Sequence, residues 1–87
     1  MIPGDLLRTK RSLWDMRGNT YLDVWDGPES TARWMGKWEH HKFALLLEGR
    51  VLQEQLSEHD DPVPMREVLL DGRVVWVMED EIVEDVT

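Results

Sequence analysis

The stretch VLLDGRVVWVMEDEIVEDV, residues 68–86, decides the fold because an Asp71-Gly72 pair separates two apolar runs. Asp-Gly is a preferred pair for the two-residue turn of a β-hairpin, since both positions of that turn need a positive φ. Residues that flank such a turn face each other in order, and the pairing extends outward until Glu67 faces Trp76. The sequence therefore predicts an antiparallel hairpin at this position.

Both faces of the predicted hairpin are apolar, which is unusual. Antiparallel hairpins commonly bury one face and expose the other to water. One face carries Arg66, Val68, Leu70, Arg73, Val75 and Val77, and the other carries Met65, Glu67, Leu69, Val74, Trp76 and Met78. The expected core consists of Val68, Leu70, Val75, Val77 and Ile82. The opposite face needs a cover, either the chain's own Trp14 segment or another protein.

Length and composition predict one folded domain over residues 1–87, with 41% hydrophobic residues. The chain has no cysteine, which excludes disulfide bonds and thiolate zinc sites. No apolar run reaches the roughly 18 residues of a membrane span. The opening MIPGDLLRTK lacks the basic-then-apolar order of a secretory signal peptide. We therefore expect a protein that is made in the cytosol and does not enter a membrane.

Turn residues divide the rest of the chain into short strands. Residues 5–10 and 20–25 predict two strands. Residues 42–56 suit a strand or a helix, and Gly49 favours the strand because glycine destabilises a helix interior. Residues 26–41 suggest at most a short helical turn. The fold class is mainly β, a small barrel of about five to six antiparallel strands with a long irregular or short-helical insertion.

The segment VWVMEDEIVEDV, residues 75–86, resembles the end of an SH3-like barrel, in which a strand, a one-turn 3₁₀ segment and a short last strand follow in order. The opening PGDL resembles the first strand of such barrels, and residues 12–19 then correspond to an RT-like loop. PGDL followed by DG…WV.ED is similar to small SH3-like proteins of bacteriophage genomes. Met78 and Glu81 stand where peptide-binding SH3 domains have proline and tyrosine, so recognition of proline motifs is not implied.

Five tryptophans in 87 residues exceed what one small core can hold. Surplus tryptophans are typical of interface anchors, because each buries a large area and keeps a polar N–H at its edge. In RWMGKW, Trp34 and Trp38 are expected to project on one side of the chain. The predicted interaction residues are Trp34, Trp38, Trp76, Leu69, Val74 and Met78.

Catalytic, metal and cofactor sites are not predicted. Neighbouring His40 and His41 point in opposite directions on a strand, and the segment His59-Asp60-Asp61 is typical of a solvated loop that binds cations weakly at most. The chain lacks the common nucleophile-elbow, phosphate-loop and zinc-protease motifs. We therefore expect a non-enzymatic protein.

The acidic charge belongs to the C-terminal part. Residues 1–50 hold 8 basic and 7 acidic side chains, net +1, and residues 51–87 hold 2 basic and 11 acidic, net −9. The acidic residues between Glu79 and Asp85 have three alternative interpretations. They protect a last edge strand from aggregation, form a docking surface for a basic partner, or mimic a nucleic-acid backbone. The basic residues near the N-terminus suit a solvated face, so nucleic-acid binding is not expected; they are Arg8, Lys10, Arg11 and Arg17.

The residues and the resemblance together lead to one main hypothesis. It is a protein–protein interaction module of phage type, a virion component such as a capsid decoration or accessory protein. Its partner is a virion or host protein or a second copy, and its location is the virion or the host cytoplasm. The alternative is an acidic regulator that binds a host nucleic-acid enzyme.

Overall fold

The computed structural model describes residues 1–10, 21–39, 41–53 and 62–85, which form one antiparallel β-sheet. Its strands are β1 (Leu6–Thr9), β2 (Tyr21–Trp25), β3 (Trp34–Glu39), β4 (Ala44–Gln53), β5 (Val63–Leu70), β6 (Arg73–Met78) and β7 (Ile82–Glu84). They lie in the order β3-β2-β6-β5-β4-β1-β7. The mainly β prediction is confirmed at this level, with seven strands in the described ranges where five to six were expected. These ranges contain no helix long and apolar enough to cross a membrane.

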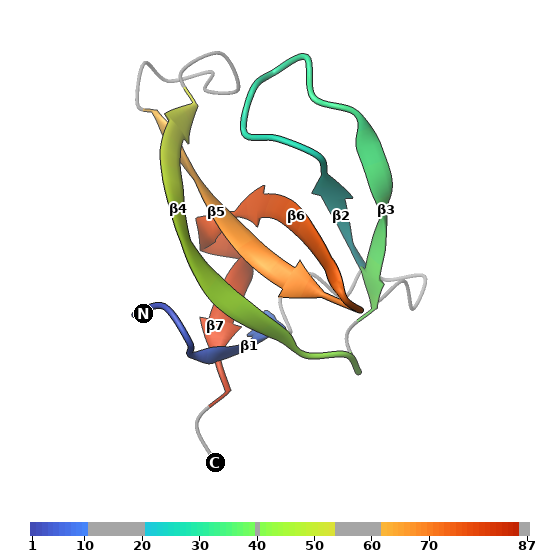
Figure 1. The fold of residues 1–87 in the computed structure, drawn as a ribbon, viewed down its shortest axis with the longest axis vertical. Helices are drawn as coiled ribbons and strands as arrows, with labels where there is room; N and C mark the ends of the chain where they lie inside the picture. The colour runs from blue at the N-terminus through green and yellow to red at the C-terminus, as the bar shows by residue number, and fades with distance from the viewer. Residues whose placement is uncertain (11–20, 40, 54–61, 86–87) are drawn as a thin grey trace.

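The sheet curls into a half-barrel (Figure 1). Strand β4 runs down the left of the view, β5 and β6 cross its middle, the β2–β3 hairpin lies to the right of β6, and β1 and β7 lie below. One hydrophobic cluster fills the concave side and consists of Leu7, Leu22, Val24, Trp38, Ala44, Leu46, Val68, Leu70, Val75, Val77 and Ile82. All five residues that were expected to form the core belong to it.

The β5–β6 hairpin has the predicted register. Leu70 faces Arg73, and Glu67 faces Trp76. Asp71 has a φ of 53° and Gly72 a φ of 77°, the two positive values that the two-residue turn requires. Local sequence therefore predicts the register of this hairpin correctly.

The chain after β6 follows the predicted order of strand, 3₁₀ turn and last strand. The 3₁₀ turn η2 spans Glu79–Glu81 and leads into β7. Strand β7 pairs with β1, so that Ile82 faces Thr9. The Lys10 backbone N–H donates to the Glu81 carbonyl oxygen at 3.2 Å and extends the pairing.

Strand β4 confirms the strand prediction for this part of the chain. Its pairing with β5 is irregular between Leu46 and Arg50, which places Gly49 in the irregular stretch. A Cβ atom on Gly49 would lie 2.7 Å from Cη2 of Trp76 and 2.8 Å from Cβ of Glu67. Glycine is needed here because the Trp76 indole crosses β5 and lies against the β4 backbone.

Strand β3 corrects the prediction of a short helical or irregular segment over residues 26–41. Residues 34–39 pair with β2 along its whole length. The register shifts between Val24 and Trp25, because Gly36 faces Val24 whereas Trp34 faces Trp25. One extra residue, Met35, therefore forms a β-bulge. The bulge hides the two-residue alternation by which sequence patterns reveal a strand.

Candidate functional site

The face of the sheet that points away from the core, called the outer face below, carries three rows of residues that face one another across strands. The first row consists of Leu6, Leu45, Leu69 and Val74. The second consists of Trp34, Trp25, Trp76 and Glu67. The third consists of Val51, Met65 and Met78. Strand pairing thus collects apolar side chains from six strands on one surface.

The second row places three tryptophans on the neighbouring strands β3, β2 and β6. Trp25 is the direct partner of both Trp34 and Trp76. Trp34 is 53% exposed, and its Nε1 donates a hydrogen bond to Asp23 Oδ1 at 2.9 Å. Trp25 and Trp76 are half-buried. The hydrogen bond holds the Trp34 ring in place while most of its surface remains open to solvent.

The first row forms an exposed aliphatic band next to the tryptophans. Val74 is 51% exposed, and Leu6 and Leu45 are exposed as well. Leu69 between them is half-buried. Scattered exposed apolar residues are ordinary on protein surfaces, whereas contiguous ones are typical of interaction sites.

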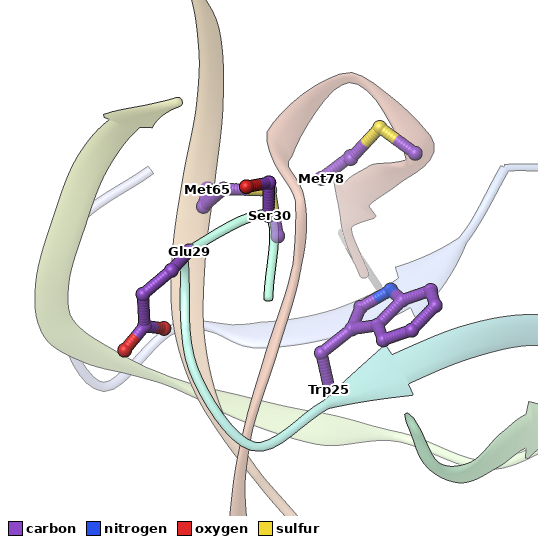
Figure 2. A pocket seen from close by; sticks show the side chains of 5 residues that line it. All are labelled: Trp25, Glu29, Ser30, Met65 and Met78. Carbon is purple, nitrogen blue, oxygen red and sulfur yellow. The ribbon is translucent and has the colours of Figure 1, made fainter. Parts of the chain in front are cut away.

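A cavity of about 100 Å³ lies at the third row (Figure 2). Its lining residues are Trp25, Glu29, Ser30, Met65 and Met78. Figure 2 shows the Trp25 indole on the same side as Met78 and the Glu29 carboxylate pointing away from that indole. The lining is therefore mainly apolar, and methionines adapt their shape to different guests.

The loop between β2 and β3, residues 26–33, covers this end of the outer face. The Asp26 carboxylate accepts a hydrogen bond from the Arg33 backbone N–H at 2.8 Å and closes the loop. Gln53 Nε2 donates to the Pro28 carbonyl oxygen at 2.7 Å and fastens the loop to the end of β4. The chain itself thus supplies part of the cover that the hairpin's second face needs. Trp14, the cover considered from sequence, lies outside the described residues.

The chain matches no protein-family model, no curated protein and no solved structure. Its functional interpretation therefore rests on the geometry of the outer face.

Trp38 requires a correction. It is 0% exposed in the core, and its Nε1 donates to the Lys42 carbonyl oxygen at 2.9 Å. The bulge at Met35 reverses the alternation of β3, so Trp34 points outward and Trp38 inward. The expected paired projection of the two rings is therefore wrong, and only Trp34 belongs to the candidate site.

The other predicted interaction residues, Trp76, Leu69, Val74 and Met78, lie together on the outer face. The outer face also holds four residues that were not among the predicted interaction residues, namely Trp25, Met65, Leu6 and Leu45. A signal for Trp25 was present, since it ends an alternating run and so faces away from Val24. The leucines of β1 and β4 show their role only when the strand order is known.

Of the residues considered for metal binding, His40 and the segment 59–61 lie outside the residues that the structure describes. His41 is exposed, with its Nε2 3.3 Å from Oε2 of Glu39. Among described residues no group of three or more His, Cys, Asp or Glu is arranged to hold a metal ion.

The acidic C-terminal segment is partly neutralised within the chain. Glu79 accepts from Arg50 Nε at 3.2 Å. Asp85 lies 3.7 Å from Arg8, and Glu84 lies 3.5 Å from the Met1 amino group. These pairs join η2 and the end of the β7 segment to β4, β1 and the N-terminus, so cations of the same chain balance part of the acidity.

Burial raises the pKa of the Glu81 carboxyl above its usual value of 4.5, and the neighbouring charges of Asp80 and Asp23 raise it further. The folded chain therefore binds the Glu81 proton more tightly than the unfolded chain does. Stability contributed by the protonated form is present below about pH 4.5 and is lost as pH rises through the raised pKa.

Glu81→Gln should remove this loss, because the amide stays neutral at every pH. We expect the variant to unfold at higher urea concentration than the parent at pH 7, with a smaller difference near pH 4. Glu48→Gln, at an exposed position of β4, is the matched control. An equal effect of Glu81→Gln at both pH values would contradict the prediction.

Proposed function

We propose that this chain is a non-enzymatic protein–protein interaction module that binds an apolar segment of a partner on its outer face. The observation that carries the proposal is the row of Trp34, Trp25 and Trp76 beside an exposed aliphatic band. Tryptophan is enriched among the few interface residues that supply most of the binding energy. A rigid sheet also holds such anchors in place before binding, which lowers the entropy lost in the complex.

Two kinds of contact follow from the geometry. The exposed Trp34 ring is an anchor that inserts into a partner. The cavity bounded by Trp25, Met65 and Met78 instead receives a side chain from the partner, and its volume of about 100 Å³ suits one aliphatic side chain. A partner segment that crosses both features would bury the half-exposed rings between them.

The charges around the rows favour a partner that also carries Lys or Arg. Glu67 ends the tryptophan row, and Glu29 lines the cavity. Neither forms an ion pair with another described residue. A cation beside the Glu67 carboxylate would lie next to the Trp76 indole, where cation–π attraction adds to the charge attraction.

The proposal includes a finer assignment, an SH3-like barrel of phage type that serves as a virion component. The order of elements supports this assignment, because the chain begins with strand β1 and ends with β6, η2 and β7, as the resemblance implies. A capsid decoration or accessory protein works by docking and needs no catalytic group. Mass spectrometry of purified particles should detect the chain, and its absence from them would remove the virion part of the proposal.

Trp34→Ala tests the interaction surface. Peptides selected by display on the parent chain should bind the variant at least about 30-fold more weakly, since a hot-spot truncation costs about 2 kcal/mol or more. The selected peptides should share an aliphatic residue near a basic one. The readout is the Kd measured by isothermal titration calorimetry.

Leu52→Ala is the matched control for this experiment. Leu52 is 51% exposed and faces Pro64, so it lies on the opposite side of the sheet from Val51 and Met65. The control should leave the Kd unchanged. Peptides that bind Trp34→Ala as tightly as the parent, or a selection that returns none, would contradict the proposal.

Light scattering of the purified chain separates a foreign partner from a second copy. We expect a monomer, with the outer face left for another protein. A dimer that dissociates on Trp34→Ala would assign the outer face to self-association and overturn the foreign partner.

A second candidate, the acidic regulator of a host nucleic-acid enzyme, rests on residues 79–85. The negative charges of Asp80 and Asp23 contribute to the raised pKa of the Glu81 carboxyl, and this concentration of negative charge suits a basic partner. Such a complex should weaken steeply with salt, whereas the apolar outer face predicts a modest dependence. Neutralising Glu79, Asp80, Glu81, Glu84 and Asp85 together would abolish the regulator complex alone.

A further inference from the structure

Arg66 is a buried cation on the core side of β5. The residue is 8% exposed, and its Nε atom is buried without a hydrogen-bond partner. No ion pair joins Arg66 to any described acidic side chain. Buried charged groups are normally paired, because removal from water without a partner costs several kcal/mol. The Nε–H donor, buried without an acceptor, therefore indicates that an anionic partner is missing beside Arg66.

The strand register places a second arginine directly beside it. Arg50 of β4 faces Arg66, on the same side of the sheet. Like charges at facing positions repel each other. Glu79 neutralises Arg50 through its contact with Nε at 3.2 Å, which leaves one positive charge uncompensated. Val77, the β6 neighbour of Arg66, is apolar and supplies no acceptor.

We propose that Arg66, with Arg50 beside it, binds one small oxyanion, a carboxylate or a phosphate. A planar guanidinium presents parallel N–H donors that match two oxygens of such a group. A polyanion is a poor ligand, because Glu79 adjoins the site and the chain carries a net charge of −8. The site lies on the opposite face from the tryptophan rows and is independent of the proposed docking surface.

Thermal unfolding of the full chain in different salts tests the proposal. The melting temperature is measured at pH 7 and equal ionic strength in sodium chloride, sodium acetate and sodium phosphate. We expect acetate, phosphate or both to raise the Tm over chloride by about 6–11 °C at tenfold excess over Kd. A response to acetate alone assigns the site to carboxylates, and a response to phosphate alone assigns it to phosphate.

Two variants separate a specific site from a general salt effect, since phosphate stabilises many proteins by exclusion from their surface. Arg66→Met keeps the apolar stem and should have the same Tm in acetate as in chloride, with at most a small general gain in phosphate. Arg73→Met, at an exposed position next to the hairpin turn, should respond as the parent does.

The Arg66 Nε–H signal in a proton–nitrogen correlation spectrum provides a second measurement, assigned by its loss in Arg66→Met. It should shift on addition of acetate or phosphate and stay in place with chloride. Equal Tm in all three salts, or an equal gain in the parent and Arg66→Met, would overturn the proposal. A large destabilisation by Arg66→Met without any anion effect would also overturn it, because Arg66 would then be satisfied by the chain itself.

Discussion

Trp38→Ala should lower the free energy of unfolding by about 3–5 kcal/mol, the largest effect expected of any substitution considered for this chain. The ring is 0% exposed in the core, and its loss leaves a cavity that a small sheet cannot close by relaxation. The substitution also removes the hydrogen bond that Trp38 Nε1 donates to the Lys42 carbonyl oxygen at 2.9 Å. The total stability of a domain of this size is about 4–13 kcal/mol, so the loss takes at least about a quarter of it and unfolds the variant at the lower end of that range.

Urea unfolding followed by far-UV circular dichroism measures this loss. Trp34→Ala is the matched control, since it removes an equal ring from the same strand at a 53% exposed position, and it should change stability by about 1 kcal/mol or less. Trp38→Phe should recover most of the loss, because the phenyl ring refills the core. The recovery stays incomplete because phenylalanine cannot donate the hydrogen bond to the Lys42 carbonyl oxygen. Equal losses in the two alanine variants would contradict the opposite orientation of the two rings.

Gly36→Ala should lower the free energy of unfolding by about 1–3 kcal/mol, although the new methyl group meets no atom. Gly36 has a φ of 133°, and a Cβ atom built there has no neighbour within 4 Å. The expected loss is therefore backbone strain at the bulge and not overpacking. The sign is informative, because Gly→Ala at an ordinary position stabilises a protein by about 0.4–1 kcal/mol.

Urea unfolding also tests Gly36→Ala. Glu39→Ala, an exposed position on the same strand, should change stability by about 0.5 kcal/mol or less. A Gly36→Ala variant that is as stable as the parent, or more so, would show that the bulge does not depend on glycine.

The parts of the fold that sequence predicted are those fixed by neighbours along the chain. The Asp71-Gly72 turn sets the register of β5 and β6, and that register divides their side chains into a core face and an outer face. The turn from β6 through η2 into β7 follows the same local logic. Four core residues could be named because they lie on one short hairpin, and the fifth, Ile82, follows from the order of strand, 3₁₀ turn and last strand.

The parts that sequence missed depend on a single inserted residue or on strands distant in the chain. Met35 forms a bulge that sends Trp34 and Trp38 to opposite faces, and no local pattern marks it as the extra residue. The tryptophan row requires β2 to lie beside β6, which is a long-range pairing. The sequence therefore predicted about half of the residues on the outer face but not their arrangement across neighbouring strands.

The pairing of β1 with β7 sets a kinetic order for folding. Leu7 faces Glu84, 77 positions away (84 − 7), whereas Leu70 faces Arg73 three positions away (73 − 70). Closing a long loop costs more chain entropy than closing a short one, and proteins with many contacts between distant residues fold more slowly. The β5–β6 hairpin, which carries Trp76, is therefore expected to form early and the β1–β7 ladder late.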